Sequence, residues 1–213
     1  MDKILEIKDL HVHYFSNRRT VKAVNDLSLD MQRGRVLGLV GETGAGKTTL
    51  ALSILNMIRA PQGKIISGSI RFNNTDILGM SNQELREMRG KDIAMIFQDP
   101  MTALNPVLTI GEQIAETIYK HEKISKAEAW SKSEEMLETV GIPGVRAKEY
   151  PHQFSGGMKQ RVVIALSLAC NPTLLLADEP TTALDVTIQA QVLDLMRGLI
   201  KTNNTSVLFI THS

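Results

Sequence analysis

A glycine-rich segment carries the most specific chemistry in this chain. Residues 41–48 read GETGAGKT, which fits the pattern G-x-x-x-x-G-K-[ST] at every fixed position. Glycines let a loop wrap phosphate oxygens with several backbone N–H groups, and a following helix directs its positive N-terminal dipole at the same oxygens. The segment predicts a loop that binds the phosphates of a nucleoside triphosphate, in which Lys47 reaches the β- and γ-phosphates and the Thr48 hydroxyl binds Mg²⁺. The alternative is a glycine-rich turn that binds nothing.

Two adjacent carboxylates form the second candidate site. Asp178 and Glu179 close the apolar run at 174–177, which predicts a buried strand. The carboxyl end of a parallel strand is where such sheets bind ligands. Asp178 suits the surroundings of a Mg²⁺ ion, and Glu179 could polarise a water that attacks the γ-phosphate. A solvated strand end is the alternative, and the phosphate loop elsewhere in the chain favours the functional interpretation.

The phosphate loop needs a strand before it and a helix after it, and the sequence predicts both. Residues 35–41 read RVLGLVG, which predicts a strand buried on both faces. A helix is expected from about Lys47, with apolar residues at helical spacing. Upstream, alternating apolar residues on both sides of the polar turn Ser16–Arg19 predict an antiparallel hairpin.

The rest of the chain alternates strands with helices. Strands are expected at 92–97, 174–178 and 207–211, one helix after the glycine pair Gly156-Gly157 to about Ala169, and another at 187–201. Between them the segment 109–140 has helical periodicity, with a capping box at Ser125 and Glu128, a packed Trp130 and an end at Gly141. This pattern predicts an α/β fold with a mostly parallel core sheet, an N-terminal antiparallel β part and an inserted helical sub-domain.

Composition sets limits on partners and compartment. The chain has 213 residues and a net charge of +1, which gives no electrostatic drive towards nucleic acid. Its one cysteine, Cys170, lies in an apolar run and is interpreted as a small core residue. No secretory signal is visible at the N-terminus, and no apolar run approaches the roughly 20 residues that span a bilayer. We therefore expect another chain to hold this one at any membrane where it works.

Five further motifs follow in an order that resembles the ATPase subunits of ABC transporters, a family of P-loop NTPases. Gln98 is placed like the Q-loop glutamine, and FSGGM at 154–158 resembles the signature motif LSGGQ. Ala183-Leu184-Asp185 resembles the D-loop, and Thr211-His212 resembles the switch histidine. Tyr14 is placed like the aromatic residue that stacks on adenine, with Phe15 as a rival and a half-buried strand residue as the alternative.

The resemblance implies a site for ATP and Mg²⁺. Glu179, His212, Lys47 and Gln98 would be the catalytic residues, and Thr48, Gln98 and Asp178 would serve the metal ion. Besides Tyr14, the residues expected to bind ATP are Gly41, Glu42, Thr43, Gly44, Ala45, Gly46, Lys47, Thr48 and Thr49.

The signature motif would serve the nucleotide of a partner subunit. The family implies two subunits that sit head to tail around two ATP molecules, and the residues assigned to the partner's ATP are Ser155, Gly156, Gly157, Met158 and Gln160, with Asp185 in the D-loop. Serine and two glycines at a helix N-terminus form an anion site in their own right. Phe154 and Met158 replace the commoner leucine and glutamine, whereas the phosphate-facing residues are retained.

Narrower motifs resemble the dipeptide, oligopeptide and nickel importers. These are QDPMTALN at 98–105, YPHQFSGGM at 150–158 and DEPTTALDV at 178–186. The resemblance implies transmembrane permease subunits that dock near Gln98 and the following helices, a substrate-binding protein that acts indirectly, and a peripheral place on the cytoplasmic face of the cell membrane. It also implies a RecA-like core with an antiparallel β part at 1–98 and 155–213, and a helical sub-domain at 99–154.

The end of the chain leaves alternatives open. Relatives of this kind carry an aspartate after the switch histidine and continue further, whereas this chain has Ser213 as its last residue. Either the sequence is a fragment that lacks the C-terminal part of the family's domain, or the protein is short. A non-catalytic nucleotide-binding module is therefore one alternative function. A soluble ABC ATPase of DNA repair or translation is another, although the near-neutral charge and short insert count against it.

Overall fold

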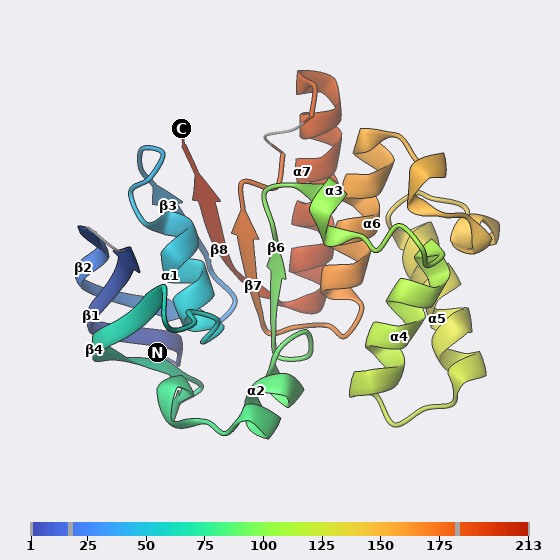
Figure 1. Cartoon of the computed structure of the whole chain (residues 1–213). Coiled ribbons are helices and arrows are strands. Elements are labelled where there is room, and N and C mark those ends of the chain that lie inside the picture. The colour runs from blue at the N-terminus through green and yellow to red at the C-terminus, as the bar shows by residue number, and fades with distance from the viewer. Residues whose placement is uncertain (1, 17–18, 182–183, 213) are drawn as a thin grey trace. The chain divides into compact units, whose positions relative to one another are not determined.

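The computed structural model describes residues 2–16, 19–181 and 184–212, with the backbone alone for Pro100 and Met101. The chain divides into two compact units, one formed by Met1–Arg89 with Ser206–Ser213 and the other by Gly90–Thr205. Figure 1 shows the elements of both units.

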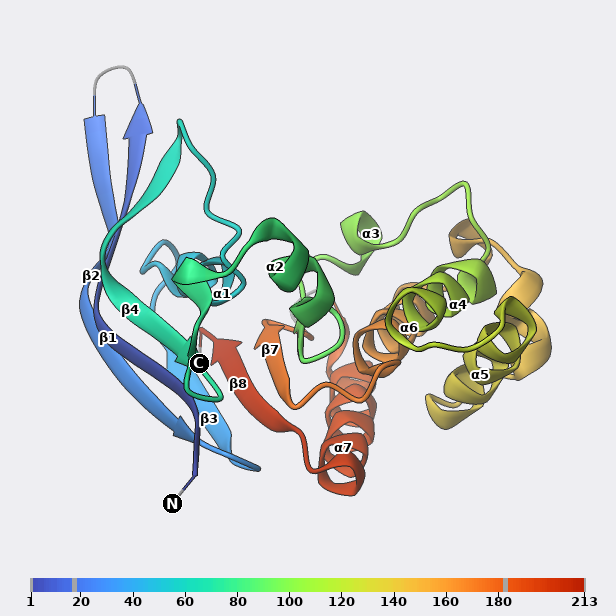
Figure 2. The ribbon, with the colours of Figure 1, turned by 90° about the horizontal axis from the view of Figure 1, so that it is seen from below.

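The first unit contains an antiparallel sheet with strand order β2-β1-β4-β5. Strands β1 (Lys3–Ser16) and β2 (Arg19–Gln32) pair antiparallel, which confirms the predicted hairpin strands, although residues 17–18 of its turn lie outside the described residues. Strand β4 (Gly63–Phe72) pairs with the other side of β1, and β5 (Thr75–Asp76) follows it. Figure 2 shows β2, β1 and β4 side by side as one curved sheet.

A parallel strand pair and three short helices complete this unit. Strand β3 (Val36–Val40) pairs in parallel with β8 (Ser206–Thr211), and helix α1 (Lys47–Ile54) begins at the predicted residue. A 3-10 helix at Ile77–Gly79 and helix α2 (Asn82–Met88) follow β5.

The prediction that β3 is buried on both faces is wrong. Its residues alternate between exposed and half-buried, and Val36 and Val40 are 62% and 64% exposed. Strand β3 lies at the end of its sheet and has β8 as its one hydrogen-bonded neighbour among the described strands. An apolar run therefore indicated a strand correctly, but it could not tell an edge strand from a central one.

The second unit combines a buried parallel pair with helices. Strand β6 (Ile93–Ile96) pairs in parallel with β7 (Leu174–Asp178), whose five residues are all buried. Helices α6 (Gly156–Leu168) and α7 (Val186–Asn203) confirm the predicted segments. The remaining helices are α3 (Pro100–Ala103), α4 (Ile110–His121), α5 (Lys126–Thr139) and 3-10 turns at Gly144–Lys148 and Pro151–Gln153. The boundaries 99–154 for a separate sub-domain stay a prediction.

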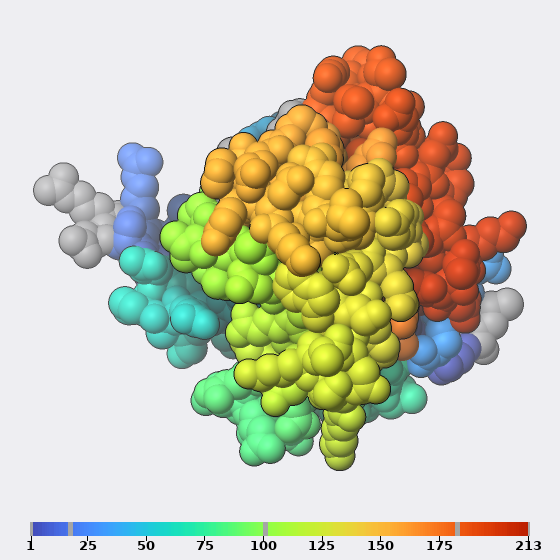
Figure 3. All heavy atoms as spheres, turned by 90° about the vertical axis from the view of Figure 1, so that its right-hand side faces the viewer, coloured from blue at the N-terminus to red at the C-terminus, as the bar shows by residue number. Residues whose placement is uncertain are grey.

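Capping boxes set the starts of helices α4 and α5. Ser125 and Glu128 cap α5 reciprocally, as predicted, and Thr109 with Glu112 does the same for α4. Gly141, with a φ of 74°, follows the end of α5 at the predicted position. Figure 3 shows α5 and the segment that precedes α6 on one continuous face of this unit.

Cys170 follows α6 and is half-buried, and its Sγ lies 3.8 Å from the carbonyl oxygen of Thr117. Burial raises the pKa of its thiol to about 11, which fits a packing role. Among the described residues, each helix is too short or too polar to cross a bilayer.

Candidate functional site: a phosphate loop and an acidic strand end

The phosphate loop joins β3 to α1, in the strand–loop–helix context that its sequence requires. Gly44 and Gly46 have φ angles of 81° and 84°, values that residues with a Cβ rarely adopt. Glu42, Thr43, Gly44 and Ala45 are exposed, so the loop presents its backbone to solvent. This conformation fits a loop that wraps an anion.

Strand β2 packs closely against the phosphate loop at Gly46. A Cβ added at Gly46 would lie 2.0 Å from the carbonyl oxygen of Ala23, so no other residue fits there. A hollow of about 200 Å³ lies between β2, β3 and the loop, lined by Ala23, Val24, Asn25, Leu27, Leu39, Val40, Gly41, Ala45, Gly46, Lys47 and Leu50. Ala23 could not be recognised as part of this site from the sequence, because its position in an alternating strand does not indicate a contact with Gly46, 23 residues further on.

Lys47 is held inside this loop. Its side chain is only 8% exposed, and Nζ donates to the carbonyl oxygens of Gly41 at 2.6 Å and Glu42 at 2.8 Å. Nζ also lies 3.2 Å from Nδ1 of His212. Because an ammonium group donates and never accepts, His212 must accept through Nδ1, and a neutral ring protonated at Nε2 fits this contact. The structure thus brings together two predicted catalytic residues that are 165 positions apart.

The first turn of α1 carries the two threonines of the predicted site. Thr48 is exposed and Thr49 is half-buried, and α1 has no acidic residue in its first turn. A helix start without negative charge favours a bound anion. The glycine cradle, the buried ammonium group and this helix start fit a triphosphate, and the hydroxyl of Thr48 is a hard oxygen donor of the kind that Mg²⁺ prefers.

The two carboxylates lie at the end of β7 as predicted. Asp178 is 2% exposed and Glu179 is 6% exposed. Glu179 has a φ of 49°, a left-handed conformation that is uncommon for a residue with a side chain and that clusters at functional sites. Burial of an acidic pair at a strand end does not fit a merely solvated terminus, so the structure favours a functional interpretation.

Gln98 and Glu179 also meet. The amide Nε2 of Gln98, two residues after β6, donates to Oε2 of Glu179 at 2.9 Å. The parallel pairing of β6 with β7 places their carboxyl ends at the same edge, which explains the contact across 81 positions. An amide and a carboxylate in this arrangement can position one water molecule between their oxygens.

The structure distinguishes the two aromatic candidates for adenine by their surroundings. Tyr14 is half-buried, and its ring packs against Gly63, where an added Cβ would lie 2.8 Å from Cε1. Phe15 is 41% exposed and makes an edge contact with His13, whose ring centroid is 6.3 Å away. Both alternatives for adenine stacking stay predictions.

The signature residues start α6. Ser155 is the N-cap residue, and its Oγ accepts from the amide of Met158 at 3.4 Å. Gly156 is open, with nothing within 4 Å of an added Cβ, whereas an added Cβ at Gly157 would lie 2.7 Å from Cγ2 of Ile188. Gln160 is only 1% exposed, and its Nε2 has no hydrogen-bond partner among the described residues. Its burial favours packing over ligand contact, and its predicted role stays untested.

The predicted D-loop leads into α7. Asp185 is the exposed N-cap residue, and Ala183 lies outside the described residues. The side chain of Gln189 folds back over this start, where Nε2 donates to the carbonyl oxygens of Thr181 at 3.0 Å and Leu184 at 2.9 Å.

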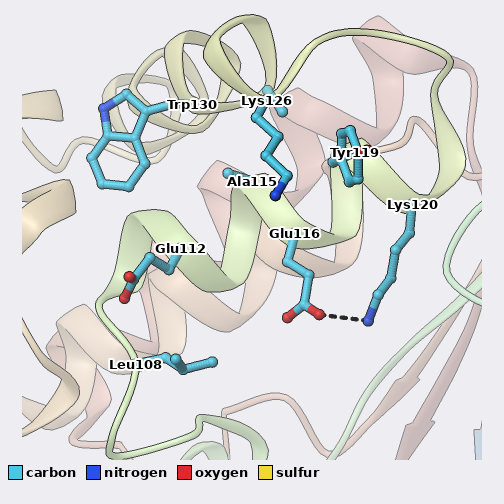
Figure 4. Close-up of a pocket in the computed structure, with 9 residues that line it drawn as sticks. Leu108, Glu112, Ala115, Glu116, Tyr119, Lys120, Lys126 and Trp130 are labelled. Carbon is cyan, nitrogen blue, oxygen red and sulfur yellow. Dashed lines mark ion pairs between the residues drawn. The ribbon is translucent and has the colours of Figure 1, made fainter.

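A separate pocket of about 640 Å³ lies along α4 and α5 (Figure 4). It is lined by Leu108, Glu112, Ala115, Glu116, Tyr119, Lys120, Lys126, Ala129 and Trp130. Lys126 Nζ lies 5.7 Å from the centre of the Tyr119 ring, and Glu116 pairs with Lys120 at 2.6 Å. Trp130 packs against Gly111, as the prediction of a packing role requires, and its indole N–H donates to Glu134 at 3.0 Å. The pocket therefore combines aromatic walls with charges of both signs.

The fold and the loop define a P-loop nucleotide-binding protein with parallel strands and helical additions. Comparison with known proteins narrows this class, because the family model described as "ABC transporter" matches residues 24–182. The chain belongs to the ABC transporter family.

Curated relatives agree with this assignment. The chain is 49% identical over 214 residues to a dipeptide transport ATP-binding protein, DppD, and 50% identical over 212 residues to an oligopeptide transport ATP-binding protein, OppD, both of Bacillus subtilis. These alignments cover 100% and 99% of this chain but 64% and 59% of the relatives. The chain thus spans about three-fifths of the length of the curated relatives that it matches.

Solved structures confirm the predicted fold class. The ATP-binding cassette MJ0796, solved as a dimer in a post-hydrolysis state with ADP and phosphate, matches with a TM-score of 0.86 and 27% identity. The match covers 98% of this chain and 88% of that one. The α/β fold with an antiparallel and a parallel sheet is therefore that of an ABC cassette.

Proposed function

We propose that this chain is the ATP-binding and ATP-hydrolysing subunit of an uptake transporter for small peptides, with nickel as an alternative cargo. The observation that carries the proposal is the glycine cradle that holds the buried Lys47 beside His212, in a chain about half identical to peptide-transport ATP-binding proteins. The role that each residue has in this proposal is given separately below. As a peripheral subunit, the chain would work on the cytoplasmic face of the cell membrane.

The proposed reaction is in-line attack of water on the γ-phosphate of Mg-ATP. Glu179 orients the water with help from the Gln98 amide, and Lys47 with His212 stabilises the charge that develops on the phosphate. Thr48, Gln98 and Asp178 offer a hydroxyl, an amide oxygen and a carboxylate, which are hard oxygen donors that suit Mg²⁺. Bound Mg²⁺ would neutralise charge on the phosphates.

The second half of each nucleotide site comes from a partner subunit in this proposal. Ser155, Gly156 and Gly157 start a helix of 13 residues, and their amides offer an anion site for the partner's γ-phosphate. Asp185 would lie at the same interface. A dimer of MJ0796 gives a precedent for paired cassettes. The helical sub-domain at 99–154, which ends just before the signature residues, is proposed as the part that contacts the permease.

The experiment is a phosphate-release assay with Mg-ATP on this chain and on a longer one. Phosphate release is expected with Mg²⁺ and should fall to background with excess EDTA, because the metal ion is required for charge neutralisation. A control assay repeats the measurement after Mg²⁺ is restored. If ATP binds to both this chain and a longer one but neither releases phosphate, the chain is a non-catalytic nucleotide-binding module.

We further propose that the transmembrane permease subunit docks at the pocket along α4 and α5. The pocket is close in sequence to Gln98, and its aromatic and charged lining suits an amphipathic segment of a partner. Ala115→Arg places a long side chain in the pocket and is expected to abolish co-purification of the permease while ATP affinity stays unchanged.

The matched control is Ala127→Arg, which puts the same side chain on the exposed part of α5 outside the pocket. Permease that still co-purifies with Ala115→Arg at the wild-type ratio would place the docking site elsewhere.

A further inference from the structure

Arg146 makes an unusual set of contacts next to the signature motif. It lies in the 3-10 turn Gly144–Lys148, and its Nε lies 3.1 Å and 3.0 Å from the two carboxylate oxygens of Glu149, while Nη2 lies 2.6 Å from Oε2. This bidentate ion pair fixes the plane of the Arg146 guanidinium group. Hydrogen bonding from Arg146 holds the pKa of the Glu149 carboxyl below its ordinary value.

The same guanidinium group reaches both sides of the signature turn. Nη2 donates to the carbonyl oxygen of Gln153 at 3.2 Å, and the guanidinium carbon lies 4.5 Å from the centre of the Phe154 ring. Nη1 lies 3.5 Å from the sulfur of Met158. One side chain therefore touches the residues immediately before Ser155 and the residue after Gly157.

We propose that Arg146 is a positioning residue that holds the turn Ser155–Gly157 in the geometry that presents its amides to the partner's nucleotide. The inference rests on the proposed function of these residues, and it adds a residue that lies outside the signature motif itself.

Other contacts hold the helix side of the turn, where the amide of Lys159 donates to the carbonyl oxygen of Ser155 at 2.9 Å and Gly157 packs against Ile188. Gly156 has no atom within 4 Å of an added Cβ, and the N-cap bond from the Met158 amide to Ser155 is long, at 3.4 Å. Phe154 is buried and Met158 is half-buried, so clamping these two residues constrains the glycines between them. A planar guanidinium group can pair with a carboxylate, stack on a ring and donate to a carbonyl at once, which a lysine cannot do.

The contacts of Arg146 give a physical reason for Phe154 and Met158, the two residues that differ from the commoner signature sequence. The ring at Phe154 offers a face to the guanidinium group, and the thioether at Met158 offers a polarisable contact. Leucine and glutamine at these positions would lack the ring face and the thioether. Arg146, Phe154 and Met158 thus act as one unit in this chain.

The experiment compares Arg146→Ala and Arg146→Lys with Arg197→Ala in the full-length protein. Arg197 is the matched control, because it also pairs with an acidic residue three positions away, Asp194, but lies exposed on α7. For Arg146→Ala we expect kcat to fall by about 10- to 100-fold, since small displacements of positioned groups have effects of this size. Arg146→Lys should recover only part of kcat, and Arg197→Ala should match the wild type.

Three further measurements separate positioning from folding. ATP affinity of the monomer and Tm should stay as in the wild type, whereas hydrogen exchange at the Met158 amide should become about fivefold faster in Arg146→Ala, as expected when a local turn loosens. A lower Tm with faster exchange throughout residues 90–205 would assign Arg146 to folding and overturn the proposal. So would a wild-type kcat in Arg146→Ala.

The same measurements distinguish a failure of the proposed ATPase function from a failure of the inference on Arg146. If the wild type itself releases no phosphate, the proposed function fails, while exchange at the Met158 amide still decides whether Arg146 holds the turn. If the wild type is active and Arg146→Ala is equally active, the inference alone fails.

Discussion

Glu179→Gln is expected to lower phosphate release by at least about 100-fold and to leave an ATP-bound dimer that does not open. General base catalysis by a positioned carboxylate typically contributes 10²–10⁴-fold, and an amide cannot take up the proton of the attacking water. The Gln98 amide lies 2.9 Å from the Glu179 carboxylate, and glutamine retains one oxygen that can accept this bond. The substitution therefore removes the chemistry while it keeps the shape of the site.

Phosphate release and the mass of the protein in saturating Mg-ATP are the two measurements. Glu135→Gln is the control, because Glu135 is an exposed carboxylate in the same unit. Protein that stays monomeric in saturating ATP contradicts the sandwich dimer. Undiminished hydrolysis by Glu179→Gln would remove Glu179 from the catalytic role.

Lys47→Ala is expected to weaken Mg-ATP binding by about 100-fold or more, since it removes a buried ammonium group from the phosphate site and bonds to charged partners are among the strongest. In the structure the three donors of Nζ are shared among Gly41, Glu42 and His212. We expect nucleotide phosphates to replace some of these acceptors. The alanine also leaves Nδ1 of His212 without its lysine partner.

Titration calorimetry with Mg-ATP measures this effect. Lys8→Ala, which removes an exposed lysine from β1 in the same unit, should bind ATP as the wild type does. Full affinity in Lys47→Ala would count against the phosphate loop, and against the transporter function with it.

The sequence alone determined the local features of this protein. The phosphate loop, the capping box at Ser125 and Glu128, and the end of α5 at Gly141 follow from chemistry within a few residues of each other. These features depend on backbone dihedral angles and on hydrogen bonds to the unpaired N–H groups of a helix start, and residues close in sequence determine both. For the same reason most strands and helices of the core were predicted to within a few residues.

Only the tertiary structure decided how distant groups meet. Nothing local indicates that His212 reaches Lys47, that Gln98 reaches Glu179, or that Arg146 spans the signature turn. The exposure of β3 was equally hidden, since an apolar run has the same periodicity at the edge of a sheet as in its middle. These contacts depend on strand order and on side-chain packing between residues far apart in sequence. Local sequence patterns predict neither.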